Sequence, residues 1–75
     1  MKIDLIDIKL VKLLKKRFNL SSRIGDVKKK IGLKITDKAR EKKVMTNVKK
    51  NAGKYKNEIS QIFSVIIKKS RELQK

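Results

Sequence analysis

The sequence predicts an all-α protein of three helices, the first of them long. Proline is absent, only three glycines occur, and aromatic residues make up 4% of the chain, a composition that favours helices over a turn-rich β fold. Apolar residues also recur at alternating steps of three and four, which is the period of an amphipathic helix. With 75 residues, the chain is expected to form one domain, residues 1–75, whose core would bury a modest fraction of its surface.

The first helix is expected over residues 3–30, a length of about 40 Å at ~1.5 Å per residue. Its apolar seam is interrupted at Arg17 and otherwise contains Ile3, Ile6, Leu10, Leu13, Leu20, Ile24 and Val27. Two shorter helices cannot cover a seam of this length, so we expect much of it to face a second copy of the chain in a helix-swapped or side-by-side homodimer. Gly25 lies within the pattern, which suggests close approach by a neighbouring element.

The second helix is expected over residues 37–51. Gly32 can end the first helix, and Gly53 is placed to end the second. Thr36 offers a hydroxyl and Asp37 a carboxylate as N-cap of the second helix.

The stretch 51–58, "NAGKYKNE", is interpreted as a connecting loop, and the third helix is expected to start near Asn57. The residues expected to face inward are Ala39, Val44 and Val48 in the second helix and Ile59, Ile62, Phe63, Ile66, Ile67 and Leu73 in the third.

The residue inventory limits the chemistry of the chain. There is no Cys and no His, which excludes disulfides, thiol nucleophiles, imidazole bases and the usual zinc sites. No apolar run approaches the ~20 residues that span a bilayer, and acidic residues interrupt the N-terminal stretch where a signal peptide needs apolar ones. We therefore predict a cytoplasmic protein without a membrane partner.

The net charge of +16 would ordinarily indicate nucleic-acid binding, because Lys and Arg neutralise phosphates. The excess is mostly Lys, however, and it is spread over every segment after the first ten residues. The chain also has almost no aromatic residues on which bases would stack, which weakens this hypothesis.

Two cations lie on nearly the same face of the first helix. Lys28 follows Arg17 by about three helical turns, and two cations are costly to bury together unless anions meet them. Alternatively, Arg17 extends its charged end to solvent at the edge of the seam or pairs with a carboxylate of a neighbouring helix. Lys28 is one of three consecutive lysines, and its alternative role is that of a solvated surface side chain.

A second group of polar residues falls on the later helices. Asp37 is explained by itself as a helix cap, whereas Arg40 and Glu41 point about 100° apart and can approach different sides of a pocket. Ser70 and Gln74 lie four residues apart on one helix face, an arrangement also expected of polar residues at the point where the third helix leaves the core.

Taken together, three separated blocks resemble the all-helical chorismate mutase family, over nearly the entire chain. The blocks are "IDLIDIKLVKLLKKRFNLSSRIGDVKKKIG", "ITDKAREKKV" and "ISQIFSVIIKKSRELQ". The matching positions include Arg17, Gly25 and Lys28 in the first, Asp37, Arg40 and Glu41 in the second, and Phe63, Ile66, Ser70 and Gln74 in the third.

The resemblance implies an intertwined three-helix homodimer that rearranges chorismate to prephenate without a cofactor or a metal. It also implies roles for individual residues. Arg17 would grip a substrate carboxylate, Lys28 and Gln74 would hold the ether oxygen, Ser70 would donate to the ring carboxylate and Glu41 would accept from the ring hydroxyl. Asp37 and Arg40 would line the same end of the site.

One departure from the family concerns an Arg three residues before the position of Ile3, which would fall ahead of Met1. Lys2 would be a poor substitute, and losing one charge-assisted contact would cost ~2 to 4 kcal/mol, so weakened activity is expected. Two alternatives stay open: a non-catalytic dimerisation or regulatory module of the same fold, and a small basic nucleic-acid-binding helical protein.

Overall fold

The structure is a computed structural model that describes residues 2–34 and 37–75. In chain order it contains α1 (Lys2–Ile31), α2 (Lys38–Ala52), a short 3₁₀ turn η1 (Gly53–Tyr55) and α3 (Lys56–Gln74). The prediction of an all-α fold is confirmed. The stretch interpreted as a loop is instead helical almost throughout, because η1 joins α2 to α3 directly.

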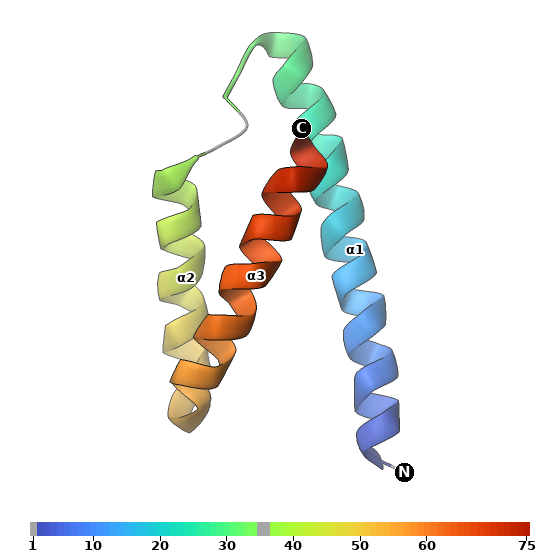
Figure 1. Cartoon of the computed structure of the whole chain (residues 1–75), viewed down its shortest axis with the longest axis vertical. Helices are drawn as coiled ribbons and strands as arrows, with labels where there is room; N and C mark the ends of the chain where they lie inside the picture. Colours follow the sequence, from blue (N-terminus) through green and yellow to red (C-terminus); the bar gives the residue numbers. More distant parts are fainter. Residues whose placement is uncertain (1, 35–36) are drawn as a thin grey trace.

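The helix α3 lies between the other two (Figure 1), and it packs against both, while the backbones of α1 and α2 do not meet in the part of the chain that the structure describes. The helices α2 and α3 form an antiparallel pair, and the C-terminal end of α3 reaches the C-terminal half of α1. The N-terminal half of α1 stands apart from the other helices in the same view.

Glycines end two of the helices through left-handed backbone conformations. Gly32 has φ 74°, and the N–H of Leu33 donates back to the carbonyl of Lys28 at 2.9 Å, a hydrogen bond typical of a glycine-terminated helix end. Gly53, with φ 58°, ends α2. Both glycines therefore end helices as predicted.

The start of α2 is capped by a carboxylate. The side chain of Asp37 accepts from the backbone N–H of Arg40 at 3.0 Å, as expected of an N-cap. The alternative cap, Thr36, lies outside the described residues.

The closest packing between helices occurs at Gly25. A Cβ at this residue would lie 2.5 Å from the Cα of Gln74 and 2.6 Å from its carbonyl oxygen. The prediction that a neighbouring element approaches Gly25 is confirmed, and this contact fixes the last turn of α3 against α1.

The single chain buries little apolar surface. Among the described residues Ile66, at 8% exposure, is the one buried hydrophobic side chain, while the apolar residues of the α1 seam are exposed from Ile3 to Val27. The radius of gyration is 14.0 Å, against about 11 Å for a compact chain of this length. The accessible surface of 6555 Å² also exceeds the ~4,700 Å² of a typical folded monomer of this mass.

The prediction that Ala39, Ile62 and Leu73 face inward is wrong for the single chain. Ala39 is exposed because α2 contacts α3 through a face that carries Val44 and Val48 instead. Ile62 and Leu73 are also exposed, because none of the described helices covers their side of α3. None of the described helices is both long enough and apolar enough to cross a membrane.

Replacing Gly25 by alanine is expected to lower the free energy of unfolding by about 1–2 kcal/mol. The added methyl group would overlap the backbone of Gln74, which no rotamer change can move, and the higher helix propensity of alanine offsets about 1 kcal/mol of that cost. Urea titration followed by far-UV circular dichroism, at one protein concentration, measures the change.

The matched control is Asn19→Ala, at an exposed position of the same helix where alanine gains propensity without a clash. Equal or higher stability of Gly25→Ala relative to this control would show that the contact between α1 and α3 is looser than described.

Candidate active site

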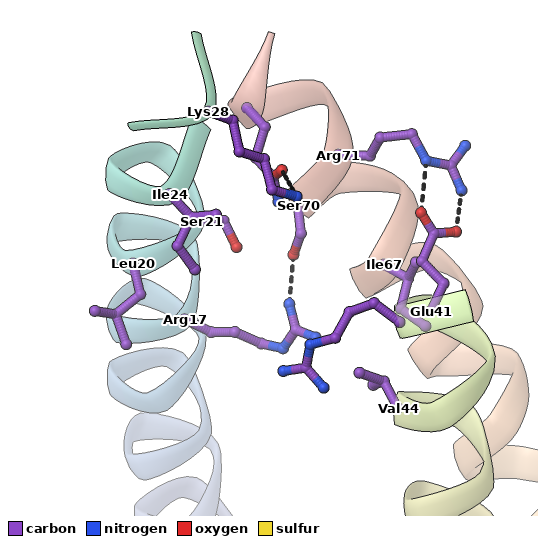
Figure 2. A pocket seen from close by; sticks show the side chains of 12 residues that line it. Arg17, Leu20, Ser21, Ile24, Lys28, Glu41, Val44, Ile67, Ser70 and Arg71 are labelled. Carbon is purple, nitrogen blue, oxygen red and sulfur yellow. Dashed lines mark hydrogen bonds and ion pairs between the residues drawn. The ribbon is translucent and has the colours of Figure 1, made fainter. Parts of the chain in front are cut away.

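A pocket of about 280 Å³ lies among the three α-helices, near the lower end of the range of small-molecule sites, about 300–1,000 Å³. It is partly open to solvent and combines apolar walls with charged groups (Figure 2). Its lining residues are Arg17, Leu20, Ser21, Ile24 and Lys28 of α1, Arg40, Glu41 and Val44 of α2, and Ile67, Ser70, Arg71 and Gln74 of α3.

Arg17 points across the pocket from α1 to α3 (Figure 2). Its Nη1 donates to the hydroxyl of Ser70 at 2.6 Å, and its guanidinium lies 5.9 Å from the centre of the Phe63 ring. Ser70 is itself buried, at 5% exposure, so the hydroxyl is a fixed acceptor. These contacts hold the guanidinium in place. The alternative pairing of Arg17 with a carboxylate of a neighbouring helix is not observed among the described residues.

Lys28 and Gln74 meet nearer the C-terminal ends of their helices, about three turns after Arg17 on α1 and about one turn after Ser70 on α3. The ammonium of Lys28 donates to Oε1 of Gln74 at 3.4 Å. An amide that accepts through its oxygen keeps its N–H groups to donate elsewhere. Lys28 is half-buried, so the alternative of a fully solvated lysine is wrong.

Two guanidinium groups face the same pocket without an anion between them. The pKa of Arg17 is lowered, first by burial and then by the positive charge of Arg40. Among the described residues, no carboxylate pairs with either guanidinium. A base with a lowered pKa still carries its charge at neutral pH, so this end of the pocket holds unfavourable positive charge that an anionic ligand would relieve.

The opposite side of the pocket carries an ion pair between α2 and α3. Glu41 accepts from Arg71 through both carboxylate oxygens, at 3.1 Å from Nε and 2.5 Å from Nη2 (Figure 2). The pKa of Arg71 is raised, chiefly by this hydrogen bonding and then by the charge of Glu41. Glu41, the one carboxylate among the described lining residues, is therefore already neutralised, and the remaining positive charge of the pocket is available to an anionic ligand.

The structure brings six of the seven predicted site residues into one pocket, namely Arg17, Lys28, Arg40, Glu41, Ser70 and Gln74. Asp37 does not line it: its carboxylate caps α2, and the residue lies along a shallow neighbouring groove beside Lys28. The cap instead fixes the first turn of α2, from which Arg40 and Glu41 project.

Two polar lining residues, Ser21 and Arg71, were not found by sequence reasoning. The Ser21 hydroxyl points into the pocket, although the residue is 6% exposed overall (Figure 2). Its spacing of four residues from both Arg17 and Gly25 was a usable signal. Arg71 lies three residues before Gln74, which is a weaker signal, and its pairing with Glu41 on another helix could not be found from local spacing.

The fold and the pocket thus define a small helical protein with a cationic site for an anionic ligand. Comparison with protein families gives a match to chorismate mutase type II over residues 1–75. The chain belongs to the chorismate mutase type II family, whose members are isomerase enzymes.

Individual relatives agree with this assignment. A protein of Methanocaldococcus jannaschii named chorismate mutase is 32% identical over 77 residues, covering 99% of this chain and 78% of the relative. A solved structure of a conserved hypothetical protein from Pyrococcus furiosus superposes with a TM-score of 0.77 at 35% identity, covering 99% of this chain and 87% of that one.

Arg40→Gln is expected to raise the free energy of unfolding of the ligand-free protein by a few tenths of a kcal/mol. Burial is the main reason that the pKa of Arg17 is lowered, and repulsion by Arg40 is the second. Removing the Arg40 guanidinium relieves that repulsion, and a pair of like charges near the protein surface destabilises by about a few tenths of a kcal/mol. Urea titration at low ionic strength measures the gain, which added salt should diminish.

Lys43→Gln serves as the control, because it removes the same charge from an exposed position of α2 that does not line the pocket. Greater stabilisation by Lys43→Gln than by Arg40→Gln would mean that the pocket cations do not repel each other appreciably.

Proposed function

We propose that this chain converts chorismate to prephenate by a Claisen rearrangement and that the pocket among its helices is the active site. The observation that carries the proposal is the convergence of Arg17, Lys28 and Arg40 on one cavity whose carboxylate is already paired. Chorismate is a dianion, and a site with this excess of fixed positive charge suits two carboxylates. Membership in the chorismate mutase type II family supports the same substrate.

The first part of the mechanism is selection of the reactive conformer. The enolpyruvyl arm must fold over the ring before the new bond can form, and cations that grip both carboxylates favour that geometry. Arg17 provides a planar fork suited to one carboxylate, and Ser70, which holds the Arg17 guanidinium, lies beside it as a second donor. Arg40 adds positive charge from the α2 side of the cavity.

The second part is stabilisation of the transition state. The C–O bond breaks ahead of formation of the C–C bond, so negative charge gathers on the ether oxygen. Lys28 and the amide of Gln74 are proposed to donate to that oxygen, and donors aimed at developing charge act mainly on the barrier. The rearrangement is intramolecular and transfers no proton, which suits a lining without an imidazole or thiol.

The third part is recognition of the ring hydroxyl. Glu41 is the carboxylate acceptor among the lining residues, and it is proposed to accept from that hydroxyl. Asp37 contributes indirectly in this proposal, because its cap holds the first turn of α2 that carries Glu41.

The protein is expected to turn over chorismate, followed as loss of the substrate's ultraviolet absorbance. Arg17→Ala and Lys28→Ala are each expected to lower kcat/KM by about 100-fold or more, since each removes a charged donor from a partly desolvated site.

Arg23→Ala is the matched control, because Arg23 is an exposed cation of α1 that does not line the pocket. Turnover that survives in both Arg17→Ala and Lys28→Ala would refute the assignment of this pocket as the active site.

We further propose that the functional unit is an intertwined homodimer. The accessible surface of the single chain exceeds that of a typical monomer by about 1,800 Å². The excess of two chains, about 3,600 Å², lies within the range of about 2,000–5,000 Å² that obligate dimers bury. Exposed apolar residues on the free half of α1, such as Leu10 and Leu13, are the surface proposed to be buried.

Leu13→Glu is expected to convert the dimer to a monomer of 8.7 kDa with reduced helix content, because a carboxylate would be buried in the apolar seam. Sedimentation equilibrium measures the mass of each variant.

Lys12→Gln lowers the net charge by the same amount at an adjacent exposed position and should leave the dimer intact. A wild-type chain that sediments as a well-folded monomer would rule out the dimer.

A further inference from the structure

Arg71 lines the pocket but has no role in the mechanism proposed above. It lies one position after Ser70 on α3, lines the pocket, and forms the bidentate ion pair with Glu41. The two residues are 30 positions apart, and their contact joins α3 to α2 across one side of the cavity.

The geometry of this pair differs from that of an ordinary surface ion pair. Lys69 and Glu72, on the same helix, touch through a single contact of 3.5 Å, with side chains 59% and 46% exposed. Arg71 and Glu41 are 37% and 26% exposed and are joined by two parallel hydrogen bonds. A planar fork of this kind fixes the orientation of a carboxylate, whereas one flexible ammonium does not.

The negative charge of Glu41 must be compatible with an anionic ligand. A carboxylate beside a dianionic ligand would repel it, yet the proposed mechanism needs a carboxylate as acceptor for the ring hydroxyl. An ionised carboxylate has about four lone-pair sites, of which Arg71 occupies one on each oxygen. The pair can therefore accept from a hydroxyl while presenting almost no net charge.

We propose that Arg71 is a positioning residue that acts through Glu41: it orients the carboxylate toward the ligand hydroxyl and masks its negative charge from the anionic ligand. This inference rests on the proposed function of the pocket. It assigns to Arg71 no direct contact with the carboxylates of the substrate.

A double-mutant cycle tests the inference. Arg71→Gln is expected to raise KM for chorismate about 10- to 100-fold with a change in kcat of less than about threefold, because masking and hydroxyl binding act on bound substrate and transition state alike. In a Glu41→Gln background the same substitution should change KM by less than about threefold. The double variant should consequently bind substrate better than Arg71→Gln alone, because the unmasked carboxylate has been removed.

Two further variants complete the design. Arg71→Lys should recover part of the loss, since it restores the charge without the fork. Lys69→Gln, which removes the exposed ion pair on the same helix, should leave KM and kcat unchanged. Far-UV circular dichroism and the thermal midpoint verify that each variant is folded.

The outcomes separate this inference from the function on which it rests. Additive effects in the cycle, or unchanged KM in Arg71→Gln, overturn the role of Arg71 while turnover by the wild type persists. A wild type without turnover that still binds a bicyclic dicarboxylate analogue of the transition state allows the same cycle on the dissociation constant of that analogue. Absence of both turnover and analogue binding in the wild type overturns the proposed function and the inference together.

Discussion

The close approach of α3 to α1 at Gly25 is the constraint on which the rest of the site depends. Because no side chain separates the two backbones there, the last turn of α3 lies directly against α1. Gln74 then faces Lys28, and one turn earlier Ser70 faces Arg17. The donors of the pocket are thus paired in register by a single backbone contact, and a larger residue at this position would separate both pairs at once.

Charge explains why this arrangement favours binding over stability. Burial and, after it, the charge of Arg40 lower the pKa of Arg17, and an ion pair on the opposite wall neutralises the carboxylate that would otherwise offset the pocket cations. Such a site is costly to fold empty and gains most from an anion. The small core of one chain, in which Ile66 is the one buried hydrophobic side chain among the described residues, leaves little stability to meet that cost.

Much of this could be predicted from residue spacing along each helix. Arg17 and Lys28 share a face of α1, Ser70 and Gln74 share a face of α3, and the pocket contains all four. Asp37 was identified as a cap for the same reason, since capping is a local interaction. Arg71 was missed because its importance arises from Glu41 on another helix, and Ala39 was misplaced because periodicity leaves open which stripe of α2 meets α3.

The sequence by itself determined that the chain is helical, where its glycines end helices, and which residues lie on a common face. These are properties of neighbouring residues, governed by backbone conformation and by the angle between successive side chains around one axis. Only the tertiary structure decided that Glu41 pairs with Arg71 and that α3 meets α1 at Gly25. Contacts of this kind depend on the register and crossing of separate helices, which packing of the whole chain sets and no local spacing encodes.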